Sequence, residues 1–220
     1  HHGLGAGVND GLWHTLERNL AADLTEAQPG NTLLAVNGVY IRGNCRLDDI
    51  RLKADMSDQV VYEDAEDGLI LGWDVYDNDP AGAVVSNLDD GGNRVIRCQG
   101  TGRANGYRLR YPGGALWHDT THVTAEWRLK SSEGFTVYFD CFTSDGQRYL
   151  YYTPIDTDNL GSGTYVHHGL GSDVADGAWH TFARDLAADL AEAQPANTLL
   201  EVNAFYLRGN ALVDDISLGE

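Results

Sequence analysis

Apolar and polar residues alternate along most of the chain from Ala83 onward, in short runs separated by glycine-rich turns. Runs such as "THVTAEWRLK" and "GFTVYFDCFT" change character at nearly every residue, which is typical of strands with one buried face. The turns carry Asp-Gly, Asn-Gly or Gly-Gly pairs, which favour hairpins. About ten such strands at regular spacing predict an all-β fold, an antiparallel β-sandwich (jelly roll).

One short segment departs from this alternation and predicts the single helix of the sandwich. The run "LAADLAEA" at 186–193 follows Asp185, a residue type that caps helix N-termini, and is stopped by Pro195. A near-identical run occurs at 20–27, between Asn19 and Pro29.

These two runs belong to a longer internal repeat. Residues 1–52 align without a gap with residues 167–218, and 35 of the 52 positions are identical. The stretch 55–166 has no second copy in the chain. We therefore predict two parts, the back half of a preceding β-sandwich repeat at 1–54 and a complete repeat at 55–220.

The half repeat allows two interpretations, because half a sandwich leaves sheet edges and an apolar face uncovered. Residues 1–54 are either the remnant of a truncated longer chain or a donor half that pairs with neighbouring copies of the chain. Cys45 is not retained in the second copy, where Ala211 replaces it, so we expect it to be dispensable for the shared fold. Cys98 and Cys141 show no metal-binding spacing, and we expect free buried thiols.

The formal net charge of −18 narrows the choice of partners. A surface this acidic repels phosphate backbones and anionic lipid, so we expect neither a nucleic-acid nor a membrane partner. It attracts cations, and calcium prefers carboxylate and carbonyl oxygens; simple solubility in a salty medium explains the charge equally well. Because the chain begins with histidine rather than methionine, we interpret it as a piece of a longer translation product, so a missing signal peptide has no meaning. We expect the parent to be a secreted or cell-surface protein with several such repeats.

The two ends of the complete repeat resemble a known family. The stretch "VYEDAEDGLILGWDVYDNDPAG" (61–82) is similar to the opening of jelly-roll carbohydrate-binding modules of the galactose-binding-domain-like type, and "LVDDISL" (212–218) is similar to their closing strand. The resemblance implies that the first and last strands lie side by side and that a structural calcium sits between their acidic residues. The implied ligands are Glu63, Asp64, Asp214, Asp215 and backbone carbonyls near Asn93. The alternative is that the two final aspartates form a polar turn.

Sugar binding needs flat aromatic faces and polar side chains, and several stretches offer both. "YRLRYPGGALWHD" places aromatic residues and paired arginines on a strand and its following loop, and arginine suits acidic sugars or sulfate. "RYLYYT" places two tyrosines on one strand face. We expect Trp127 and Trp179 in the core and Trp117 exposed. The candidate glycan-binding residues are Tyr107, Arg110, Tyr111, Trp117, His118, Tyr149 and Tyr151.

No catalytic motif is present in the sequence, so we predict a non-catalytic protein. The adjacent His167 and His168 point to opposite strand faces and do not predict a shared metal. Two functions stay open. One is a carbohydrate-binding-like repeat that holds a polysaccharide or glycan while calcium stabilises the fold. The other is a structural repeat of an extracellular adhesin or filament, in which 1–54 complements a neighbouring subunit.

Overall fold

The computed structural model divides the chain into two units, His1–Ser57 and Asp58–Glu220. In the second unit it describes residues 59–219. In the first unit it describes Gly3, Val8, Gly11, His14, Leu16, 18–31, Leu33, Val36 and 38–46.

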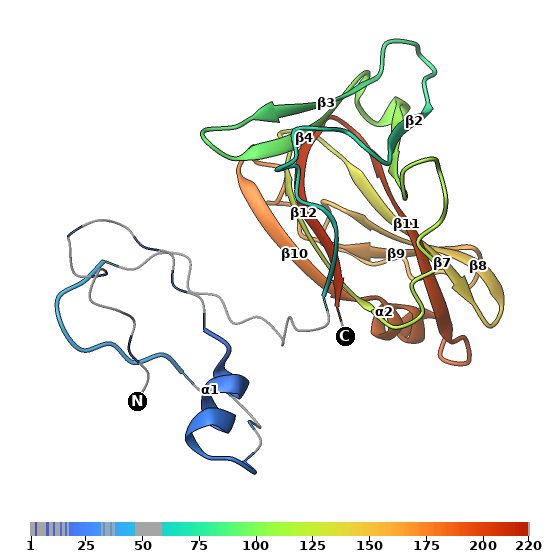
Figure 1. Cartoon of the computed structure of the whole chain (residues 1–220). Coiled ribbons are helices and arrows are strands. Elements are labelled where there is room, and N and C mark those ends of the chain that lie inside the picture. Colours follow the sequence, from blue (N-terminus) through green and yellow to red (C-terminus); the bar gives the residue numbers. More distant parts are fainter. Residues whose placement is uncertain are drawn as a thin grey trace. The chain divides into compact units, whose positions relative to one another are not determined.

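The second unit is a sandwich of two six-stranded sheets (Figure 1), so the predicted all-β sandwich is confirmed. The first sheet has the order β10 (Trp179–Asp185), β6 (Thr124–Lys130), β12 (Ala211–Gly219), β4 (Arg94–Gln99) and β3 (Val84–Asp89), and β1 (Val60–Glu63) also pairs with β12. The second sheet has the order β2 (Trp73–Asp77), β5 (Gly106–Leu109), β11 (Leu199–Arg208), β7 (Thr136–Thr143), β8 (Gly146–Thr153) and β9 (Tyr165–Gly169). The pairing of β8 with β9 is parallel, and every other ladder is antiparallel. The first and last strands lie side by side, as the resemblance implied.

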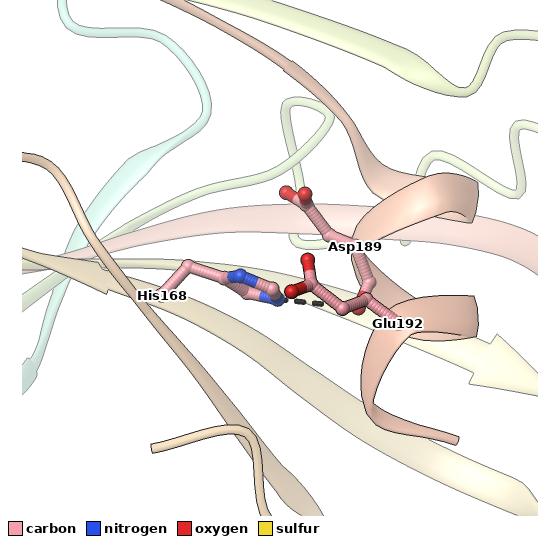
Figure 2. Close-up of side chains that lie close together, drawn as sticks. All are labelled: His168, Asp189 and Glu192. Carbon is pink, nitrogen blue, oxygen red and sulfur yellow. Dashed lines mark hydrogen bonds between the residues drawn. The ribbon is translucent and has the colours of Figure 1, made fainter. Parts of the chain in front are cut away.

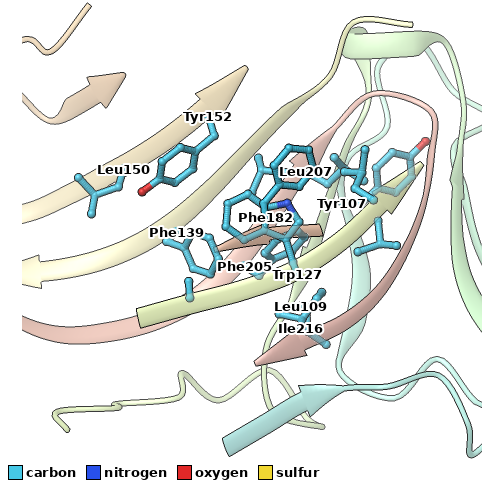
Figure 3. Packing of buried hydrophobic residues seen from close by; sticks show 14 of the residues in the cluster. Tyr107, Leu109, Trp127, Phe139, Leu150, Tyr152, Phe182, Phe205, Leu207 and Ile216 are labelled. Atoms are coloured by element: carbon cyan, nitrogen blue, oxygen red, sulfur yellow. The ribbon is translucent and has the colours of Figure 1, made fainter. Parts of the chain in front are cut away.

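The core lies between the sheets and follows the alternation of the sequence (Figure 3). In β6 every second residue is buried, and Trp127 lies at the centre of the strand. Its indole ring is 5.3 Å from the ring of Phe182 and 5.4 Å from that of Phe139, centroid to centroid. Trp127 therefore joins the two sheets, as predicted for a core residue. Trp179 is only partly buried, because its ring faces the cationic groups of Arg128 and Lys130 rather than the core.

The predicted short helix is α2 (Leu186–Ala193), and it closes one end of the sandwich. The carboxylate of Asp185 accepts a hydrogen bond from the amide N–H of Ala188, which satisfies a free donor of the first turn. Leu186 and Leu190 place their side chains in the core. In the described part of the chain, no helix combines the length and the apolar character needed to cross a membrane.

The first unit contains α1 (Leu20–Ala27), the repeat counterpart of α2, with the same kind of cap from Asn19. Residues 38–42 correspond to 204–208 of β11, but they lie outside any described helix or strand. Residues 38–42 therefore form no strand, although most of the sequence is shared by the two copies. Predictions for the remaining residues of 1–54 lie outside the described residues.

The cysteines of the second unit behave as predicted. Cys98 and Cys141 are free and fully enclosed in the core. Burial disfavours the thiolate and raises the pKa of both thiols. They act as small apolar residues.

Candidate functional site

The outer face of the second sheet, which points away from the core, carries an unusual series of polar and aromatic side chains. Strand alternation places Phe205 and Leu207 in the core and turns Tyr206 outward between them. The cross-strand pairing carries this orientation to the neighbouring strands, although on β9 the row member His167 is itself buried. As a result, six directly opposed residues form one row across six strands: Asp74, Arg108, Tyr206, Tyr138, Tyr151 and His167.

Tyrosines dominate this surface. Two pairs stack across neighbouring strands, Tyr138 with Tyr151 at 5.5 Å and Tyr149 with Tyr165 at 5.3 Å between ring centroids. These and two further rings form what we call the tyrosine face: Tyr76, Tyr138, Tyr149, Tyr151, Tyr165 and Tyr206. Five of its rings and Arg208 line a hollow of about 170 Å³. Tyr165 is exposed and the other five tyrosines are half-buried, so the face offers partly accessible flat apolar area.

Arginines frame the tyrosine face at the β2 and β5 side. The Arg108 guanidinium binds Asp74 through two hydrogen bonds, of 3.0 and 2.6 Å, and lies 5.8 Å from the centroid of the Tyr206 ring. Arg208 pairs with Asp77, the last residue of β2, through one hydrogen bond, and its other terminal nitrogen donates to the carbonyls of Arg103 and Ala104. Each guanidinium is held in place, and each positive charge already has a carboxylate partner.

Asp140 is the buried acid of this surface. It follows Tyr138 on the same face of β7 and is 5% exposed. Gln147 donates a hydrogen bond of 2.9 Å to it. Burial raises the pKa of Asp140, and burial also raises the pKa of Tyr149 to about 12. The Tyr149 hydroxyl therefore stays protonated in neutral solution and can donate as well as accept hydrogen bonds.

Three of the predicted glycan-binding residues lie on this outer face. Tyr149 and Tyr151 belong to the tyrosine face, and the Arg110 guanidinium lies 3.5 Å from Asp74. The sequence analysis also placed Arg108 on one face with Arg110, but it missed most of the surface: Tyr76, Tyr138, Tyr165, Tyr206 and Arg208. The available signal was the single tyrosine placed between core residues in "TVYFD" and "AFYLR".

Two predicted positions were wrong. Tyr107 is completely buried, because it alternates with the outward Arg108 and so faces the core. Trp117 is 5% exposed rather than open, and its ring stacks on Tyr62 at 3.8 Å. It is buried because its segment runs along β11, where the Trp117 amide donates to the carbonyl of Asn203.

The remaining two predicted residues pack elsewhere. Tyr111 is exposed and lies 5.9 Å from the ring of Tyr62. His118 is exposed, adopts a positive φ of 51° and faces the carboxylate of Glu201 at 3.1 Å. Both lie in the segment that follows β5, and the part of it around His118 runs along β11.

The carboxylates predicted to bind calcium already have other partners. Glu63 accepts hydrogen bonds from the Ala65 amide and the Trp73 indole, at 2.7 and 2.6 Å. Asp214 accepts from the side-chain amide of Asn93 at 2.8 Å, and the guanidinium of Arg128 lies 3.3 Å away.

Two further contacts complete this picture. Arg128 also reaches Asp215 at 3.2 Å, and Asp64 accepts from the backbone N–H of Glu66. A guanidinium and an amide donor thus already contact Asp214 and Asp215, and hydrogen-bond donors of this kind do not suit a calcium shell of oxygen ligands. Calcium stays a prediction of the sequence that these contacts do not favour.

A different group of possible metal ligands comes together beside α2 (Figure 2): His168, Asp189 and Glu192. The Nε2 atom of His168 lies 3.2 Å from the backbone carbonyl of Asp189, a contact in which the nitrogen must carry the proton. Both carboxylate oxygens of Asp189 accept hydrogen bonds from Arg184, and one also accepts from the Tyr152 hydroxyl. The Asp189 carboxylate and His168 Nε2 are therefore used within the protein, whereas Glu192 is exposed. These contacts do not favour a metal at this cluster.

Comparisons with known proteins give remote likenesses of fold. No protein-family model and no curated protein matches the chain. Among solved structures, the family 11 carbohydrate-binding module of the cellulosomal cellulase Lic26A-Cel5E of Clostridium thermocellum is 13% identical, with a TM-score of 0.46, over 74% of this chain and 95% of that one. The family 30 module of the cellulosomal cellulase Cel9D-Cel44B of the same organism is 10% identical, with a TM-score of 0.49, over 74% and 97%.

A third structure is the family 11 module of that organism in complex with a β-1,3-1,4-mixed-linked tetrasaccharide, which is 12% identical with a TM-score of 0.44 over 73% and 95%. All three are carbohydrate-binding modules, the class that residues 61–82 and 212–218 resemble in sequence. Likenesses this remote do not identify the ligand of this chain, which has to be inferred from its own residues.

Proposed function

We propose that the tyrosine face binds a glycan without altering it chemically. The observation that carries this proposal is the hollow lined by five tyrosines and Arg208 on the outer face of the second sheet. Sugar rings present C–H groups that stack on aromatic faces, and their hydroxyls need hydrogen-bond donors and acceptors at the edges. The tyrosine rings supply the first requirement. Asp140, Gln147 and the framing arginines supply the second.

The charge of the surface favours a neutral glycan over an acidic one. Arg108 and Arg208 are each neutralised by an aspartate, and the buried Asp140 adds negative charge beside the tyrosines. The whole chain carries a formal charge of −18, which repels anionic polymers at long range. We therefore expect binding to uncharged polysaccharides, although paired arginines in the sequence alone suggested acidic sugars.

The dimensions of the face favour an extended ligand. Its row of residues crosses six strands, and five inter-strand gaps of about 4.8 Å give a length of about 24 Å. Such a row suits several consecutive sugar rings lying across the strands. This role fits the predicted secreted or cell-surface setting, where polysaccharides are the surrounding polymers.

Affinity electrophoresis of the full chain in gels containing soluble polysaccharides tests the proposal. The panel contains neutral β-glucan, xylan and mannan, with carboxylated pectin and a sulfated glycan as charged comparisons. Tyr206→Ala and Tyr151→Ala should abolish retardation by the neutral polymer that binds. The matched control is Tyr111→Ala, which removes an exposed tyrosine outside the tyrosine face.

Circular dichroism of each variant checks that the sandwich is intact. Retardation that survives both tyrosine substitutions in folded protein would disprove the assignment to this face. Binding of the charged polymers alone would disprove the inference of a neutral ligand.

A further inference from the structure

The chain contains two versions of the back half of the sandwich but one front half. We define the front half as residues 60–166, the resident back half as 167–218, and the N-terminal copy as 1–52. The N-terminal copy repeats local features of the resident half in detail. Asn19 caps α1 as Asp185 caps α2, each with a 2.9 Å bond to the amide three residues later. The ion pair Arg18–Asp23 repeats Arg184–Asp189.

Two described apolar residues of the N-terminal copy are far more exposed than their counterparts in the resident half. Ile41 is 48% exposed, whereas its counterpart Leu207 is fully buried. Val39 is 63% exposed, and its counterpart Phe205 is buried against Trp73 and Phe139. These side chains match the surface that the front half offers to β11, because β11 pairs with β5 and β7, both from the front half.

The chain connection permits the N-terminal copy to take the same place. In the folded module Val60 of β1 lies opposite Leu218 of β12 in an antiparallel pair. Leu218 corresponds to Leu52, and only the seven residues 53–59 separate Leu52 from Val60. A loop of that length can join two neighbouring antiparallel strands.

We propose that residues 1–52 can replace 167–218 on the front half, which yields a circularly permuted sandwich. The occupant of the front half is then the N-terminal copy of the same chain or of a second copy. The exchanged module retains Tyr40 and Arg42 at the positions of Tyr206 and Arg208, so the tyrosine face is preserved in sequence.

The differences between the copies explain why 167–218 is the resident half. Val39 fills less of the core than Phe205, whose ring lies 5.5 Å from that of Phe139. Arg46 replaces Leu212, which lies opposite both Arg97 and Lys130. Like charges directly opposed on a sheet are unfavourable, so the exchanged module is the less stable one.

A native cysteine pair reports on the exchange. Ala211 of β12 lies directly opposite Cys98 of β4, and both side chains are buried. The counterpart of Ala211 is Cys45, which is exposed in the first unit. Exchange would therefore place Cys45 opposite Cys98, at the Cβ separation of about 4.5–5.5 Å typical of cross-strand neighbours. A disulfide spans about 3.5–4.5 Å between Cβ atoms, so a small approach of the two strands brings the thiols within bonding range.

The test oxidises the full chain with diamide and identifies the linked peptides by mass spectrometry. The two thiols give up two electrons and two protons, which reduce diamide to its hydrazine, and one S–S bond forms. We expect a Cys45–Cys98 disulfide. A monomeric product shows exchange within one chain, and a dimeric product shows exchange between two copies.

Two variants make the test decisive. Phe205→Val gives the resident half the same core residue that the N-terminal copy has at Val39, which removes the largest packing advantage of the resident half. It should raise the yield of the Cys45–Cys98 disulfide by about tenfold or more. Ile41→Asp, at a residue exposed in the first unit, should abolish it. Formation of Cys45–Cys45 dimers without any Cys45–Cys98 product in the Phe205→Val chain would overturn the proposal. It would show that diamide oxidises Cys45 but that Cys45 does not reach Cys98. An equal yield in the Ile41→Asp chain would overturn it as well.

Discussion

The ion pair Arg184–Asp189 offers a stability test with an internal control in the same chain. Asp189 is 7% exposed and accepts hydrogen bonds from Arg184 Nε at 2.9 Å and from the buried Tyr152 hydroxyl at 2.6 Å. Asp189→Ala would leave the hydroxyl and the guanidinium without their acceptor. The counterpart Asp23→Ala removes the same carboxylate at the same position of α1, where the Arg18–Asp23 pair is not enclosed by a sandwich.

The expected loss of unfolding free energy follows from the two donors left without an acceptor, the Tyr152 hydroxyl and the Arg184 guanidinium. An unsatisfied buried hydroxyl costs about 1–3 kcal/mol. Breaking a fully buried ion pair costs about 3–5 kcal/mol, and this is reduced here because Arg184 is 29% exposed and partly hydrated. We expect Asp189→Ala to lower the free energy of unfolding by about 3 kcal/mol, which for a domain of this size lowers the Tm by about 6–12 °C.

Thermal and urea unfolding, followed by tryptophan fluorescence, measures both variants. Asp23→Ala should leave the main transition unchanged, because the cost of the substitution in the second unit arises from burial and not from the helix itself. Equal shifts for the two variants would refute this reasoning, since the helix position is then responsible. A loss of unfolding free energy below about 1 kcal/mol for Asp189→Ala would also refute it, because water molecules would then have replaced the carboxylate as hydrogen-bond acceptor.

Two further predictions concern ions and protons. Arg128 and Asn93 both donate to Oδ2 of Asp214, and the Asp215 amide donates to Oδ1, so chelation with EDTA should leave the Tm unchanged. A marked fall in the Tm, repeated in Asp215→Ala, would restore the calcium predicted from the sequence. Burial lowers the pKa of His167 below its usual 6.5, and its Nδ1 accepts from the Asn159 amide, so the folded state favours the neutral ring. The neutral His167 ring therefore contributes stability that is present above pH 6.5 and lost as the pH falls through the folded pKa. His167→Gln should flatten the dependence of the unfolding free energy on pH between neutral and mildly acidic pH. An unchanged pH dependence would contradict a neutral, buried His167.

The sequence predicted the strands but not which face of each strand would be functional. In "YRLRY" the alternation shows that Tyr107 and Arg108 point to opposite sides, yet either side can be the core. The pairing of β5 with β2 and β11 turns Arg108 outward and buries Tyr107. The prediction that Trp117 is exposed was wrong for a related reason. A glycine-rich loop is typical of an exposed segment, and the sequence does not show that this one runs along β11.

The tyrosine face could not be assembled from the sequence, because its members are far apart in the chain. Tyr76 and Tyr206 lie 5.2 Å apart as rings but 130 positions apart in sequence. Each tyrosine by itself reads as an ordinary strand residue. Only the strand order β2-β5-β11-β7-β8-β9 brings them onto one surface.

The repeat separates what the sequence determines by itself from what the tertiary structure decides. Both copies form the helix, its N-cap and the ion pair to its first turn, because these contacts join residues at most five positions apart. Only the resident copy forms the long strand that contains Tyr206, since its hydrogen-bond partners lie on β5 and β7. Tyr40, the same residue in the copy without those partners, is 94% exposed. A strand needs a neighbouring strand to satisfy its backbone and bury one face, so the local sequence sets the pattern and the front half decides whether the strand exists.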